Sequence, residues 1–140
     1  MSSIFEIKSD VKEIYDDVID RTKIFLSTYD ERLPKIPDYS SFEKMDNKSV
    51  YDVYNECLSF QDEVIDIMVR VELVHNQMVD LLSDGLSDNK YDNRHVRGVK
   101  DWIKGKTDLL DRYRYTLLEV RRLVSDRIKI LQSSMFRMGW

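Results

Sequence analysis

The chain has 140 residues, of which 42% are hydrophobic and 34% charged, with a formal net charge of −4. This composition favours a globular protein over a disordered one, and the length suits a single domain. The single cysteine, Cys57, excludes an internal disulfide and a cysteine-based zinc site. No uncharged run is long enough to span a membrane, and the first ten residues do not resemble a signal peptide. We therefore expect a cytoplasmic, reducing location.

Charge is divided unevenly along the chain. Residues 1–93 contain ten Lys and Arg against twenty-one Asp and Glu, whereas residues 94–140 contain twelve against five. Two interpretations stay open: acidic helices that pack against a basic one, or a basic segment that faces an anionic partner such as nucleic acid. The chain also lacks alanine, whose codons are GC-rich. We interpret this as a sign of an AT-rich genome, such as that of a virus or a phage.

The first predicted helix covers about residues 3–29. Ser3 and Glu6 are predicted to form a capping box, in which each side chain accepts a hydrogen bond from a backbone amide at the helix start. The apolar face of this helix is expected to contain Ile4, Ile7, Val11, Ile14, Val18 and Phe25. We expect the helix to end near Tyr29, because two prolines follow and disfavour helix at the residues before them. Residues 33–46 then form a linker.

The central helix, about residues 48–83, carries the strongest pattern. Its first apolar row is uninterrupted at spacings of three and four: Val50, Val53, Cys57, Phe60, Val64, Ile67, Val71, Val74, Met78 and Leu81. A second apolar row, shifted by one position, contains Tyr54, Leu58, Gln61, Ile65, Met68, Glu72, His75, Val79 and Leu82. A helix with two adjacent apolar rows needs more than one neighbour. We therefore expect self-association to cover the second row.

Asn47 or Ser49 is the expected cap of the central helix, which ends at a polar turn over residues 84–93. The last helix is expected over about residues 94–138, with a kink or a new cap near residues 105–108, where a glycine precedes Lys, Thr and Asp. Its core row reads Leu110, Tyr113, Leu117, Val120, Val124, Ile128, Leu131, Met135 and Met138. The predicted fold class is all-α, an elongated three-helix bundle in which the N-terminal helix packs on a long, coiled-coil-like antiparallel hairpin.

Arg70 and His75 are the candidate catalytic residues. An arginine followed by four residues and a histidine, on a helix of an all-helical protein, resembles the signature of HEPN-type ribonucleases. The resemblance implies that both residues meet at a dimer interface and cleave RNA, with the histidine as acid or base and the arginine stabilising the phosphorane. The position after the arginine is usually polar in that family and is Val71 here. The structural alternative is a salt bridge for Arg70 and a packed position for His75.

The basic C-terminal half supplies candidate nucleic-acid contacts. Its cations sit next to a tyrosine that offers a stacking plane for single-stranded DNA or RNA. The expected contact residues are Arg94, Arg97, Lys100, Lys104, Arg114, Tyr115, Arg121 and Arg122. Paired carboxylates such as Asp16 and Asp17 have no histidine or cysteine cluster near them in sequence, so we expect no metal and no cofactor.

The expected function is non-enzymatic: a self-associating helical interaction or assembly factor, either an adaptor or an inhibitor. The apolar C-terminus suits a docking surface, or it caps the end of the bundle. The expected interaction surface contains Tyr54, Ile65, Met68, Leu82, Met135, Phe136 and Trp140. A nucleic-acid-binding accessory protein and a HEPN-like ribonuclease remain the alternatives.

Overall fold

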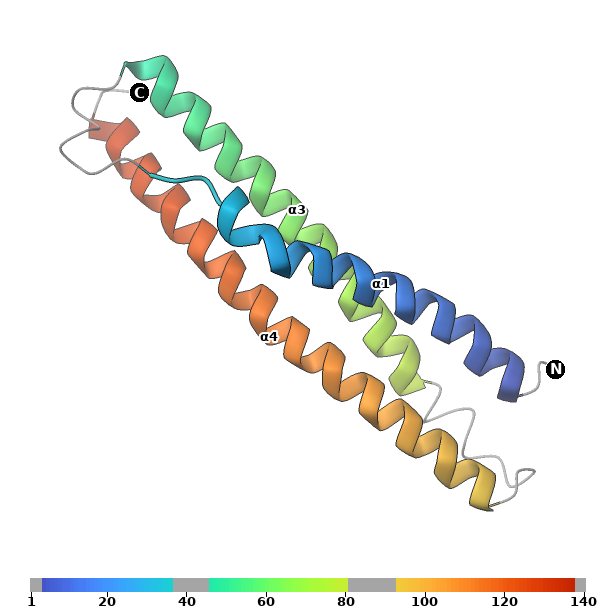
Figure 1. The fold of residues 1–140 in the computed structure, drawn as a ribbon. Coiled ribbons are helices and arrows are strands. Elements are labelled where there is room, and N and C mark those ends of the chain that lie inside the picture. The colour runs from blue at the N-terminus through green and yellow to red at the C-terminus, as the bar shows by residue number, and fades with distance from the viewer. Residues whose placement is uncertain (1–3, 37–45, 81–92, 138–140) are drawn as a thin grey trace.

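The computed structural model describes residues 4–36, 46–80 and 93–137, and these residues form three helices and no strand. Helix α1 spans Ile4–Arg32, α3 spans Asn47–Asp80 and α4 spans Asn93–Arg137. The helices run up, down and up along one long direction, and α1 lies against the hairpin of α3 and α4 (Figure 1). The all-α, elongated three-helix fold expected from the sequence is therefore confirmed. Most of the predicted linker and turn lie outside the described residues.

The core forms where the first apolar row of α3 meets the core row of α4. Uninterrupted spacing of three and four keeps one stripe of each helix facing its neighbour, so both stripes leave water together. The buried members are Val50, Cys57, Phe60, Val64, Val71, Val74 and Met78 in α3, and Leu110, Leu117, Val120, Val124, Ile128 and Leu131 in α4. No described helix is long and apolar enough to cross a membrane.

Helix α1 buries most of the described part of the expected stripe, together with positions next to it. Val18 and Phe25 are buried as predicted, but Ile14 is 45% exposed and the adjacent Tyr15 is only 2% exposed. Tyr15 and Ile19 therefore contribute to the core. Each lies one position after a residue of the expected row, Ile14 and Val18 respectively. Burial raises the pKa of Tyr15 to about 12, with smaller contributions from Tyr113 and Asp16. The helix ends at Arg32, beyond the expected end near Tyr29.

Helix α4 is continuous across the predicted break. Gly98 and Gly105 both lie inside a helix of 45 residues, and Thr107 donates a hydrogen bond to the Lys104 carbonyl at 3.0 Å instead of capping a new helix. Packing offsets the weak helix propensity of glycine, because Ile103, which lies between the two glycines in sequence, is fully buried in the core. The Lys106 ammonium lies 4.7 Å from the ring centroid of Tyr15, which ties this part of α4 to α1.

Asp46 is the cap of α3, and the expected caps Asn47 and Ser49 are inside the helix. The Asp46 carboxylate accepts the backbone amide of Ser49 at 2.7 Å, and its carbonyl accepts the amide of Val50 at 3.3 Å. Hydrogen bonds from the Ser49 hydroxyl and amide hold the pKa of Asp46 below its usual value. The cap is therefore strongest when Asp46 is ionised.

An Asp46→Asn variant should flatten the acid dependence of stability. A carboxyl with a lowered folded-state pKa stabilises the fold above the ordinary aspartate pKa of about 3.9, and this contribution is lost as the pH falls through the lower folded value. Asparagine caps helices about as well as aspartate but does not titrate. Melting temperatures measured from neutral to strongly acidic pH should fall less in the variant than in the wild type. Parallel curves would show that the Asp46 charge contributes nothing to the cap.

Candidate interaction surface

A shallow apolar groove of about 320 Å³ opens along the hairpin between α3 and α4. It is lined by Ile65, Met68, Val69, Glu72, Leu73 and Arg121. Val69 is 51% exposed and Leu73 is 58% exposed, so these side chains form the rim and not the core. We call this surface, together with Leu118 of α4, the hairpin face.

Leu118 belongs to the hairpin face because of its place on α4. The Arg114 side chain bonds Glu72 at 3.4 Å, and Arg121 lines the groove beside the same glutamate. Leu118 lies four residues after the first arginine and three before the second, so all three share one side of the helix. It is 49% exposed. Both helices of the hairpin therefore contribute apolar surface to this face.

Helix α1 packs on the other side of α3 and leaves the hairpin face open. The rings of Phe25 and Phe60 lie 5.7 Å apart, and Arg32 pairs with Glu63 while its guanidinium lies over both rings. A separate groove between α1 and α3 has both helices in its lining. None of the residues that line the hairpin groove belongs to α1.

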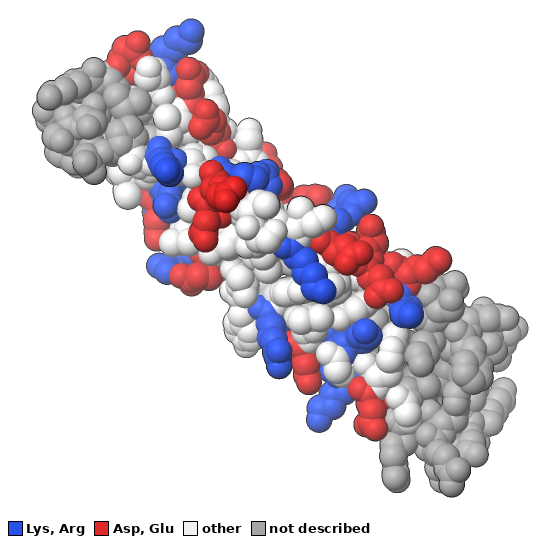
Figure 2. All heavy atoms as spheres, in the orientation of Figure 1, with Lys and Arg blue, Asp and Glu red and all other residues white. Residues whose placement is uncertain are grey.

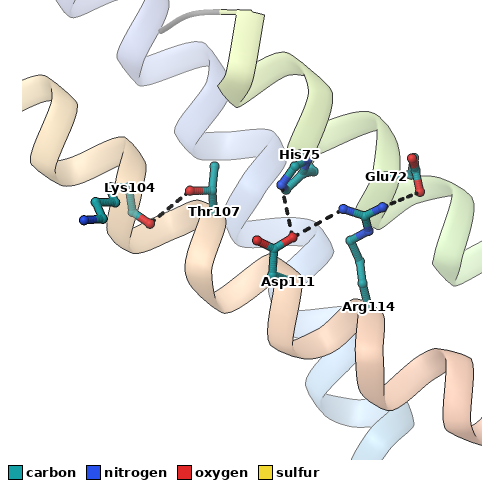
Figure 3. A network of polar contacts seen from close by, with 6 residues as sticks. All are labelled: Glu72, His75, Lys104, Thr107, Asp111 and Arg114. Atoms are coloured by element: carbon teal, nitrogen blue, oxygen red, sulfur yellow. Dashed lines mark hydrogen bonds and ion pairs between the residues drawn. The ribbon is translucent and has the colours of Figure 1, made fainter.

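The polar members of the second apolar row bond to α4. His75 Nε2 lies 3.2 Å from a carboxylate oxygen of Asp111, which Arg114 also contacts, and Arg114 continues to Glu72 (Figure 3). Further along the hairpin, the Gln61 amide donates to the Ser125 hydroxyl at 3.2 Å, and Gln132 donates to the Tyr54 hydroxyl at 3.4 Å. These bonds agree on one register of α3 against α4 along the hairpin.

The expected interaction residues are found in three different environments. Tyr54, Ile65 and Met68 are half-buried, the last two in the lining of the groove. Met135 packs against the core, whereas Phe136 is 80% exposed. Leu82 and Trp140 lie outside the described residues. The sequence analysis missed Val69, Leu73 and Leu118, because none of them belongs to an apolar row.

The structure directs Arg70 and His75 to different sides of α3. Arg70 Nε donates to Asp66 at 3.1 Å and lines the groove that α1 shares with α3. His75 contacts Asp111 of α4 instead. The two side chains thus occupy the structural roles named as the alternative to catalysis. Within one chain the two side chains do not contact each other.

Among the described side chains, the candidate nucleic-acid residues are in part paired with carboxylates and in part exposed. Arg114 and Arg122 are each paired with carboxylates, the latter with Glu119 and Asp126. Lys100, Lys104 and Arg121 are exposed, as is Tyr115, at 76%. The side chains of Arg94 and Arg97 lie outside the described part. On the face drawn in Figure 2, blue and red side chains are interspersed around a white central area.

Other potential sites are less developed. A cavity of about 610 Å³ is open to solvent, and it is lined by Arg32, Pro34, Asp52, Asn55, Glu56, Ser59, Phe60 and Glu63. Within the described residues, no group of three or more His, Cys, Asp or Glu side chains is placed to hold a metal ion. Burial raises the pKa of the Cys57 thiol, so it remains protonated at neutral pH. No known protein family, curated protein or solved structure matches this chain.

Proposed function

We propose that this protein is a non-catalytic interaction module that associates with protein partners through the hairpin face. The observation that carries the proposal is the cluster of half-exposed Val69, Leu73 and Leu118 around an apolar groove that α1 leaves open. Single exposed apolar residues are normal on soluble proteins, but contiguous ones mark interaction sites. Full burial of a large apolar side chain contributes roughly 1.5–3 kcal/mol, and each of these half-exposed residues contributes part of that range to association.

The packing of the hairpin supports this role. The polar bonds along α3 and α4 place both helices in one register, so the surface is formed before a partner binds. The separation of Arg70 from His75 supports a non-catalytic role over the ribonuclease alternative. An adaptor or an assembly factor needs only such a preformed surface.

Carbene footprinting at two protein concentrations tests the proposal. Labelling of Val69, Leu73 and Leu118 should fall when the protein is concentrated, or when its partner is added, because these side chains become buried. Ile24 of α1 is 67% exposed and Ile130 of α4 is 49% exposed. Both lie outside the hairpin face and serve as internal controls whose labelling should not change. Protection confined to Ile24, or unchanged labelling everywhere, would contradict the proposal.

A single-stranded oligonucleotide added to the same experiment separates the nucleic-acid alternative. Lysine labelling would then report on Lys100 and Lys104, which are exposed on α4. Phosphate contacts release counterions, so any such protection should disappear as salt rises. We expect that the oligonucleotide protects neither the hairpin face nor these two lysines from labelling. Oligonucleotide-dependent protection of the hairpin face or of the lysines that is lost at high salt would favour nucleic-acid binding.

A further inference from the structure

We propose that the partner of the hairpin face is a second copy of this chain, in a two-fold dimer that sets α3 of one copy against α4 of the other. This inference rests on the proposed function, because it requires association through that face. Two-fold interfaces use the same surface on both partners, so the surface has to be complementary to itself. The hairpin face meets this requirement, because α3 and α4 both contribute apolar side chains to it.

The register of the hairpin defines which residues would meet. Gln61 bonds Ser125 and Glu72 bonds Arg114, so Val69 lies at the level of Leu117 and Leu118 along the bundle. A two-fold axis parallel to the helices keeps each residue at its own level and sets α3 over α4 of the second copy. The facing helices are then antiparallel, as in up-down four-helix bundles. Val69 of one copy thus faces Leu118 of the other, and both α1 helices remain outside.

Charge at the edges of the face favours this pairing over one in which α3 meets α3. Asp62 is exposed on α3, and Arg121 and Lys129 are exposed on α4. None of the three has an ion-pair partner among the described residues. Asp62 lies at the level of residue 124, about 4.5 Å along the axis from Arg121 at the standard helical rise. Pairing α3 with α4 places the carboxylate near these cations of the second copy, whereas pairing two parallel α3 helices places the two carboxylates near each other.

Exposed apolar side chains also occur on α3 beyond the hairpin face, at Tyr51 and Val79. These two positions are about 42 Å apart at the standard helical rise. A standard interface buries roughly 800 Å² of each partner, so the dimer uses the length of both helices and not the hairpin face alone. The hairpin face itself matches a second copy in its apolar centre and in the charges at its edges.

Crosslinking between two single-cysteine variants tests the arrangement. Val69→Cys and an isotope-labelled Leu118→Cys are mixed and treated with a short bis-maleimide, and mass spectrometry separates mixed from like-with-like products. Cys57 is fully buried, so it should not compete for the reagent. The mixed product should exceed either like-with-like product at least about fivefold, because the two α3 helices lie diagonally across the dimer. Ile24→Cys, 67% exposed on α1, is the control and should give no product.

Each other outcome has a distinct meaning. A dominant product between two Val69→Cys chains would overturn the pairing of α3 with α4, while association through the hairpin face would stand. A dimeric mass by light scattering without any product from the hairpin positions would overturn both the pairing and the choice of this face. A monomeric mass, with hairpin-face protection only when another protein is added, would overturn the second copy as the partner but leave the proposed function intact.

Discussion

Replacing Val69 by lysine is expected to raise the dissociation constant of self-association at least about 100-fold, or about 2.7 kcal/mol. Val69 is 51% exposed at the groove, at the centre of the hairpin face. A lysine there loses apolar area and brings an unpaired charge into the interface, which costs several kcal/mol. It also faces the basic edge of α4 in the second copy. Sedimentation velocity over a concentration series measures the change.

The matched control is Ile24→Lys on α1. Ile24 is 67% exposed and also exchanges an apolar side chain for a cation, but it lies on the side of the bundle away from the hairpin groove. Lysine has a better helix propensity than valine or isoleucine, so neither change should reduce the helical circular dichroism signal. The control should leave the dissociation constant unchanged. Equal weakening by both variants would mean that net charge, and not the hairpin face, controls association.

A Leu117→Ala substitution should lower the free energy of unfolding by about 2–5 kcal/mol. Leu117 is fully buried, in the same core cluster as Val71 and Val74. Truncation of its side chain to alanine leaves a cavity in this core. Urea denaturation in dilute solution, where the monomer dominates, measures the loss.

The adjacent Leu118 provides the control for this core substitution. It is 49% exposed, so Leu118→Ala should change the stability of the monomer by no more than about 0.5 kcal/mol, as is usual for surface positions. The same variant should weaken self-association, whereas Leu117→Ala should weaken folding. Leu117→Ala would thus lower the free energy of unfolding, whereas Leu118→Ala would raise the dissociation constant of self-association. A large loss of monomer stability from Leu118→Ala would place this residue in the core and remove it from the hairpin face.

Sequence periodicity predicted the core of the hairpin well. The rows that contain Val64 and Leu117 have uninterrupted spacing, so the buried stripe follows from helix geometry whatever the neighbour is. In α1 the expected apolar face is buried at Val18 and Phe25, but the position of the hairpin decides that Tyr15 and not Ile14 faces inward. The glycines of α4 predicted a break because local propensity does not include the packing around Ile103.

The interaction surface was only partly predictable. Ile65 and Met68 belong to the second apolar row and do line the groove. Val69, Leu73 and Leu118 are isolated apolar positions among polar neighbours, and they become one surface only when α3 and α4 are set side by side. Which side of the hairpin stays open depends on where α1 packs, and no local pattern encodes that choice.

The most direct test of the account is the mass of the unmodified protein by sedimentation equilibrium at high salt. Burial of apolar surface drives the proposed association, and salt screens only the charges at its edges. We expect a mass of twice the 16.7 kDa of one chain at micromolar concentrations, with little dependence on salt. A mass of one chain at every concentration and salt would contradict self-association through the hairpin face.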